Sequence, residues 1–145
     1  MTDKTDKTKE RVYSSLGDIS TSDPDFARAL RPSRPTVICL CGSTRFWREY
    51  QEANRDETLR GNIVLTVGFY MYPPQAQPLF PGLMETVLPA IKAELDELHL
   101  RKIDMADEVL FLNRDGYMGE STRRELAYAR EKGKVIRFLE SPAGS

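Results

Sequence analysis

The sequence contains few of the residues that mark several classes of protein. Its 145 residues include two cysteines, one histidine and one tryptophan, and the acidic and basic side chains leave a formal net charge of −1. Two cysteines cannot frame a disulfide-stapled scaffold, and the near-neutral charge argues against a general nucleic-acid binder. No apolar run approaches the ~18 residues that a membrane span needs, and the N-terminus lacks the apolar core of a signal sequence. We therefore expect a cytoplasmic protein with neither a nucleic acid nor a membrane as partner.

The two cysteines, Cys39 and Cys41, lie two residues apart in an expected strand and so share one face of it. This placement is poor for a disulfide between them. Together with His99, the only histidine, they fall short of the four Cys or His ligands of a structural zinc site. The sequence therefore predicts no metal and no cofactor.

The composition divides the chain into two parts. Residues 1–35 are rich in Thr, Asp, Lys, Ser and Pro, and their apolar residues are too sparse for a core of their own. We expect this part to be a flexible tail. Residues 36–145 are long enough for one small domain.

Short apolar runs alternate with helix-like segments across residues 36–145. We expect strands at 36–41, 62–67, 108–113 and 134–139, and helices at 46–60, 89–105 and 121–132. One apolar stripe, predicted to be buried, runs along the second of these helices: Leu88, Ile91, Leu95 and Leu98. The alternation predicts an α/β protein with a small Rossmann-like or flavodoxin-like three-layer fold and a mostly parallel sheet of four to five strands.

Ligands of such sheets bind outside the carboxyl ends of the strands, which places the loops 42–45, 68–81 and 114–122 around one crevice. In the first loop, Gly42, Ser43 and Thr44 allow backbone N–H groups and hydroxyls to approach a phosphate at a helix N-terminus. Arg45 adds a charged donor. The alternative is a tight turn in which Ser43 or Thr44 caps the helix. Tyr70 in the second loop either stacks on a base or anchors the loop to the core.

Two interpretations are open for Glu125, which follows the third loop. With Thr122 it fits the S/T-x-x-E capping box. Alternatively, it is a carboxylate in the first helical turn, held ionised by the helix dipole and suited to attack the anomeric carbon of a sugar. His99, at the edge of the apolar stripe, is either a packed histidine or a proton donor or orienting group. Asp104 and Asp107 are expected to cap and end the helix–strand junction.

Three segments, LCGSTRF, KIDMADEVLFLN and GESTRRELAYAREKGKVI, span most of residues 36–145. In these segments the chain resembles the nucleoside 2-deoxyribosyltransferase-like family, and within it the (deoxy)nucleoside 5′-monophosphate N-hydrolases. The resemblance implies that Glu125 is the nucleophile and that no metal or redox cofactor takes part. It also implies a homodimer with the site at or near the interface. His99 stands where the family commonly has an aspartate, and Gly119 where it commonly has a serine.

The resemblance further implies a 5′-phosphate pocket formed by two of the loops, at Gly42, Ser43 and Arg45 and at Gly119, Glu120 and Ser121. The expected function is cleavage or transfer of the N-glycosidic bond of a (deoxy)nucleoside 5′-monophosphate, a small-molecule substrate. A non-catalytic nucleotide- or nucleotide-sugar-binding module, with Glu125 as a cap, is the alternative.

Overall fold

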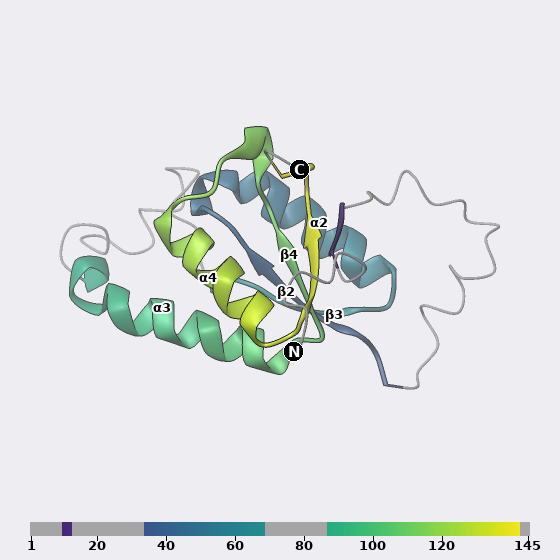
Figure 1. Ribbon diagram of the computed structural model, residues 1–145, viewed down its shortest axis with the longest axis horizontal. Coiled ribbons are helices and arrows are strands. Elements are labelled where there is room, and N and C mark those ends of the chain that lie inside the picture. Colours follow the sequence, from purple (N-terminus) through teal and green to yellow (C-terminus); the bar gives the residue numbers. More distant parts are fainter. Residues whose placement is uncertain (1–9, 13–33, 69–86, 143–145) are drawn as a thin grey trace, which may run out of the picture.

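Five parallel strands form the sheet at the centre of the molecule (Figure 1). The computed structural model describes residues 10–12, 34–68 and 87–142. The strands are β1 (Glu10–Val12), β2 (Val37–Cys41), β3 (Ile63–Leu65), β4 (Glu108–Phe111) and β5 (Val135–Phe138). They lie in the order β1-β5-β4-β2-β3, and every neighbouring pair is parallel. The predicted α/β class and the parallel sheet are confirmed.

Helices cover both faces of the sheet and make the fold three-layered. They are α2 (Trp47–Leu59), α3 (Leu88–Met105) and α4 (Glu120–Glu131), and short 3₁₀ turns lie at η3 (Thr44–Phe46) and η6 (Arg114–Gly116). Helices α3 and α4 lie side by side on one face, and α2 lies on the other (Figure 1). Within the described ranges, none of the helices combines the length and hydropathy that a bilayer crossing requires.

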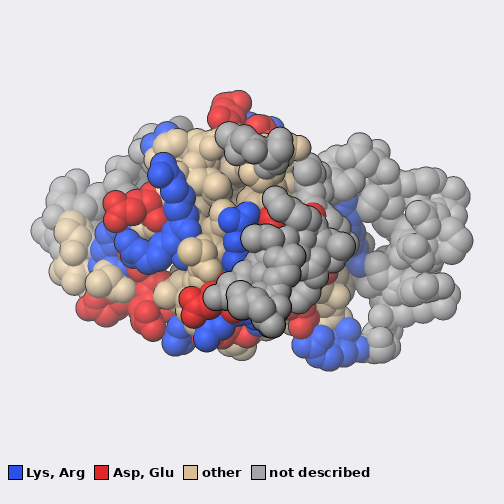
Figure 2. All heavy atoms as spheres, in the orientation of Figure 1, with Lys and Arg blue, Asp and Glu red and all other residues tan. Residues whose placement is uncertain are grey.

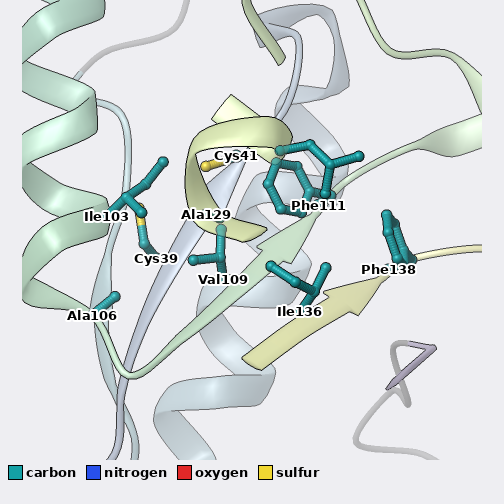
Figure 3. Close-up of a cluster of buried hydrophobic side chains, with 10 residues drawn as sticks. Cys39, Cys41, Ile103, Ala106, Val109, Phe111, Ala129, Ile136 and Phe138 are labelled. Atoms are coloured by element: carbon teal, nitrogen blue, oxygen red, sulfur yellow. The ribbon is translucent and has the colours of Figure 1, made fainter. Parts of the chain in front are cut away.

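Alternate residues of the central strands β2 and β4 face opposite sides of the sheet, and both sides are buried. This is why their sequences are apolar apart from Glu108, the first residue of β4. The side chains packed between α2 and the sheet, including two from α2 itself, are Ile38, Leu40, Tyr50, Ala53, Leu110 and Leu112. The side chains packed between the sheet and the helices α3 and α4 are Cys39, Cys41, Ile103, Ala106, Val109, Phe111, Leu126, Ala129, Ile136 and Phe138 (Figure 3). Both cysteines therefore belong to the core on the α3–α4 side.

The predicted tail contributes a strand that the sequence analysis did not anticipate. Glu10–Val12 pairs with β5, and Glu10 also forms an ion pair with Arg130 of α4 at 3.0 Å. The prediction of a flexible tail is therefore wrong for these three residues. A single short segment with one valine carries no periodic signal of its own, and it becomes a strand because β5 offers it an open edge. The predictions for residues 1–9 and 13–33 lie outside the described residues.

The buried face of α3 is not the one that the apolar stripe predicted. Ile91 and Leu98 are exposed, Leu98 by 53%. The residues that face the sheet are instead His99, Ile103 and Ala106, which are spaced by four and three positions. The helix thus turns a histidine toward the core and two large apolar side chains toward solvent.

Acidic and basic side chains are mixed on the surface rather than separated. On the face shown in Figure 2, blue and red groups lie next to each other over α3 and α4. Several of them form pairs one helical turn apart, such as Lys92 with Asp96 and Glu120 with Arg124. Exposed pairs of this kind each add little to stability.

Candidate functional site

Two thiols and an imidazole meet beneath the crossing of β2 and α3. Cys39 and Cys41 lie on the same face of β2, as the alternation of a strand requires. The Nε2 atom of His99 is 3.3 Å from the Sγ of Cys41 and 3.7 Å from the Sγ of Cys39. Both cysteines are fully buried and His99 is 8% exposed. From the sequence, we expected these three residues to be too few for a structural zinc site. The fold brings all three of their metal-binding atoms together.

The His99 imidazole also contacts the backbone of β2. Its Nε2 lies 3.1 Å from the carbonyl oxygen of Leu40. The pairing of β2 with β3 ends where Cys39 faces Leu65, one residue before that carbonyl. His99 is therefore a packed histidine, one of the two roles expected for it, and its ring is fixed in position at the carboxyl end of β2.

Glu125 does not cap its helix. Helix α4 begins at Glu120 with Gly119 as the N-cap, and no side chain makes a cap hydrogen bond. Thr122 therefore lies inside the first turn and is buried, and Glu125 lies in the second turn. The capping-box interpretation is wrong because the helix starts earlier than the box requires. The first-turn position of Glu125 is wrong for the same reason.

Burial sets the ionisation of Glu125. Burial, together with the charges of Cys39 and Asp96, raises the pKa of this carboxyl group to about 7. The positive charge of His99 and a hydrogen bond from the Cys41 thiol act in the opposite direction without cancelling the effect. This rise in pKa is opposite in direction to the expectation that Glu125 is held ionised.

The thiols and the imidazole influence each other's charge. Burial alone would lower the pKa of His99, but its hydrogen bond with Cys39 and the charges of Cys39 and Glu125 raise it above the ordinary value. A hydrogen bond with Cys41 lowers the pKa of Cys39, and burial raises the pKa of Cys41. The arrangement favours a thiolate on Cys39 beside an imidazolium on His99.

A pocket of about 210 Å³ opens between α3 and α4 beside Glu125. The residues that line it are Ala93, Asp96, Glu97, Leu100, Ser121, Arg124 and Glu125. At its edge, Lys92 Nζ donates to Asp96 Oδ2 at 2.8 Å and to Ser121 Oγ at 3.2 Å. Of the predicted site residues, Glu125 and Ser121 line this pocket.

Sequence reasoning missed Lys92, Asp96 and Arg124. Counting back from His99 by three and then by four residues reaches Asp96 and Lys92, so one face of α3 contains all three. That signal was overlooked because the apolar stripe assigned the neighbouring face to the core. Glu120, a predicted site residue, is exposed and pairs with Arg124 at 3.3 Å, and Gly119 is the N-cap of α4.

The loop after β2 forms a cap and a close contact. Ser43 Oγ accepts a hydrogen bond from the Arg45 backbone N–H at 3.3 Å and caps η3, as one of the two predictions for the loop required. A Cβ atom on Gly42 would lie 3.1 Å from both the Cβ and the carbonyl oxygen of Leu112. The Gly42 carbonyl accepts a hydrogen bond from the Tyr50 hydroxyl at 2.6 Å. A side chain at position 42 is therefore disfavoured by the close approach of Leu112, the residue that follows β4.

Arg45 contacts Tyr117 and does not line the pocket between α3 and α4. Its guanidinium lies 4.1 Å from the ring centroid of Tyr117 and donates to the hydroxyl of that residue at 3.3 Å. None of the predicted cradle residues Gly42, Ser43, Thr44 and Arg45 lines the pocket. Residues 42–45 are nevertheless close to the Glu125 carboxylate, because Gly42 directly follows Cys41, whose thiol is a hydrogen-bond partner of Glu125. Tyr70 lies outside the described residues.

Asp104 and Asp107 lie at the junction of α3 and β4, but neither caps the helix, whose C-cap is Ala106; their side chains bind other elements instead. Asp104 accepts a hydrogen bond from the Tyr128 hydroxyl at 2.6 Å. Asp107 accepts one from the Val37 backbone N–H at 2.9 Å and forms a two-point ion pair with Arg34. Neither aspartate lines the pocket.

No protein-family model, no curated protein and no solved structure matches this chain.

Proposed function

We propose that the chain cleaves or transfers the N-glycosidic bond of a (deoxy)nucleoside 5′-monophosphate, with Glu125 as the nucleophile. One observation carries this proposal: Glu125 makes no cap, and it lines a pocket with a histidine and a thiol beside it. A carboxyl group with a raised pKa in a pocket is typical of a functional site. The resemblance in sequence adds the class of reaction.

In this proposal the ionised Glu125 attacks C1′ of the sugar. The C1′–N bond breaks, its electron pair leaves with the base, and the base takes up a proton. Water or a second base then displaces the carboxylate from C1′ and restores it. His99 is buried against the thiols, so the role that its position supports is indirect: its positive charge favours the ionised form of Glu125.

The pocket also supplies groups for the charged end of the substrate. Ser121 and Arg124 line it, and Lys92 hydrogen-bonds Ser121. We infer that the 5′-phosphate lies against these groups in the first turns of α4, where the helix dipole also favours an anion. The volume of about 210 Å³ is below the ~300–1,000 Å³ typical of complete ligand sites, and it suits the sugar phosphate rather than the whole nucleotide.

The alternative, a nucleotide-binding module without catalysis, is favoured by one specific observation. A pKa of about 7 leaves a large fraction of Glu125 protonated at neutral pH, and a protonated carboxyl group is a poor nucleophile. A binding module would need Glu125 only as a hydrogen-bonding group for the sugar.

The experiment is incubation of the purified chain with a panel of ribo- and deoxyribonucleoside 5′-monophosphates, followed by chromatography for the free base. We expect release of base by the wild type and at least a 100-fold loss in Glu125→Gln. Glu131→Gln is the matched control, because Glu131 is exposed on the same helix as Glu125 and does not line the pocket, and it should keep the activity.

Release of base at the wild-type rate by Glu125→Gln would contradict the catalytic proposal. No release by the wild type, combined with nucleotide binding in calorimetry that Glu125→Gln leaves nearly intact, would favour the binding module.

A further inference from the structure

Cys39, Cys41 and His99 present three metal-binding atoms to one another inside the core. The two Sγ atoms and a ring nitrogen of the histidine all lie within 4.8 Å of one another. They come from two elements, β2 and α3. His99 is 58 residues from Cys41 and 60 residues from Cys39 in the sequence. Their closeness therefore depends on the fold and not on a local sequence motif.

The distances fit a tetrahedral metal. With Zn–S bonds of ~2.3 Å, a Zn–N bond of ~2.0 Å and tetrahedral angles, a sulfur and a nitrogen on one zinc ion lie ~3.5 Å apart. The observed Sγ–Nε2 distances of 3.3 and 3.7 Å lie on either side of that value. An ion placed among the three atoms needs only small movements of the side chains.

The donor atoms also suit a particular class of ion. Two thiols and an imidazole are soft and borderline ligands, which select zinc and similar thiophilic ions over Mg²⁺ or Ca²⁺. Two thiolates neutralise a divalent ion, so that the complex is uncharged within a core that excludes water. Two cysteines and one histidine also form a known type of zinc site, one that leaves the fourth position open.

We propose that Cys39 Sγ, Cys41 Sγ and His99 Nε2 form a binding site for one thiophilic divalent cation, of which Zn²⁺ is the type. As the Zn–S and Zn–N bonds form, the thiol protons and any proton on Nε2 pass to the buffer, and no electrons are transferred. His99 Nε2 exchanges its contact with the Leu40 carbonyl for the metal. The site does not depend on the glycosidic activity.

The first test is to prepare the untagged full-length chain under reducing conditions, strip it with a chelator, load it with one equivalent of Zn²⁺ and desalt it. Elemental analysis should find about one zinc ion per chain. Cys39→Ser, Cys41→Ser and His99→Gln should each weaken binding at least tenfold in competition with a chromophoric chelator. The control is Glu97→Gln, at an exposed acidic residue on the same helix as His99, and it should bind zinc as the wild type does. Zinc retained equally by all variants, or by none of them including the wild type, would overturn the proposal.

A second measurement avoids the risk that a buried serine unfolds the chain. Co²⁺ loaded into the wild type should give a thiolate-to-cobalt charge-transfer band and the strong visible absorption of a tetrahedral ion. A spectrum without the thiolate band would overturn the site, whatever the variants do. Because neither readout involves base release, failure of the metal site and failure of the proposed catalysis remain distinguishable.

Discussion

Glu125 is the residue at which burial changes the chemistry most. Its pKa of about 7 in the folded chain compares with an ordinary value of 4.5. Between these values the folded protein binds more protons than the unfolded chain, so stability falls as the pH rises through this range. Above pH 7 the fold contains a carboxylate in a site that favours the neutral acid. The ionised form of Glu125 therefore lowers the stability of the fold.

Replacing Glu125 by Gln should therefore stabilise the protein at alkaline pH. At pH 5, Glu125→Gln and wild type should have similar free energies of unfolding. At pH 8 the variant should be more stable by about 1–3 kcal/mol, because it removes a buried charge. Urea denaturation at both pH values measures the difference, and a gap of equal size at pH 5 and pH 8 would show that burial does not control this carboxyl group.

The same ionisation gives the proposed activity a pH dependence. Attack at C1′ requires the carboxylate, so the rate of base release should rise with pH and level off above about 7. His99→Gln removes the positive charge that favours the carboxylate, so the midpoint of the profile should move to higher pH. A profile unchanged in this variant would show that His99 has no influence on Glu125.

At the residue scale, the sequence allowed ionisable residues to be selected, but it did not allow their burial and contacts to be predicted. Glu125 could be selected because it follows the loop after a strand, and His99 because it borders the apolar stripe of its helix. The fold brings both next to Cys41, at the carboxyl end of β2. The capping box misled because Thr122 and Glu125 match it in spacing, and the start of α4 depends on Gly119, whose extended backbone no local pattern specifies. The cysteine–histidine cluster depends on which face of α3 is buried, which is decided by tertiary packing.

At the scale of elements, one buried carboxylate joins α2 to the sheet. Glu57 is fully buried on α2 and accepts hydrogen bonds from Arg137 of β5 at 2.8 and 3.0 Å. Arg60 and Asn62 donate to the same carboxylate at 2.7 and 2.9 Å. Burial opposes ionisation, but the bonds to Arg137, Asn62 and the charge of Arg60 lower the pKa of Glu57 below its ordinary value. The group is held as a satisfied anion.

Loss of this carboxylate should be costly. Glu57→Ala removes the nearer of the two carboxylates that pair with the largely buried Arg137, leaving Glu108 at 3.6 Å, and should destabilise the fold by about 3–5 kcal/mol. The double variant Glu57→Met/Arg137→Met should recover a large part of that loss, because it removes both charges. Chemical denaturation measures each variant, with Glu52→Gln as the control, since Glu52 is exposed on the same helix.

The ionisation of Glu57 also gives this prediction a pH signature. A lowered pKa means that its contribution is complete above the ordinary value of 4.5 and is lost as the pH falls through the lower folded value. The penalty of Glu57→Ala should therefore shrink in acid. A penalty that is the same at pH 3 and pH 7 would contradict the role of the charge.

At the scale of the whole molecule, α3 leaves an apolar face in solvent. Its exposed large side chains are Val87, Ile91, Leu98 and Met105, and Met105 is 70% exposed. The homodimer implied by the resemblance in sequence would cover such a face, and the pocket lies on the same helix. We expect this face of α3 to be the dimer contact.

Leu98→Glu should therefore convert a dimer into a monomer in light scattering after gel filtration. Leu59→Glu is the matched control, because Leu59 is a similarly exposed leucine on α2, across the sheet from α3, and it should leave the dimer intact. A wild-type chain that elutes as a monomer over a range of concentrations would refute the expectation, and so would a dimer that tolerates Leu98→Glu.

The overall architecture was the most predictable level. Apolar runs such as VICLC and VLFL are buried on both faces, and their alternation with helices admits few arrangements other than a parallel three-layer fold. The buried face of α3 could not be predicted, because apolar residues occur on both of its sides. Nor could β1, since a strand of three residues has no local signal and depends on pairing with the edge of β5.

The pairing of Glu10–Val12 with β5 has a practical consequence for shortened versions of the chain. A version that begins at residue 34 would leave the outer side of β5 as an open row of backbone donors and acceptors. Open edges of this kind recruit strands from other molecules and lead to aggregation. Glu10–Val12, which lie in the segment expected to be a flexible tail, therefore protect the folded domain from aggregation through this edge.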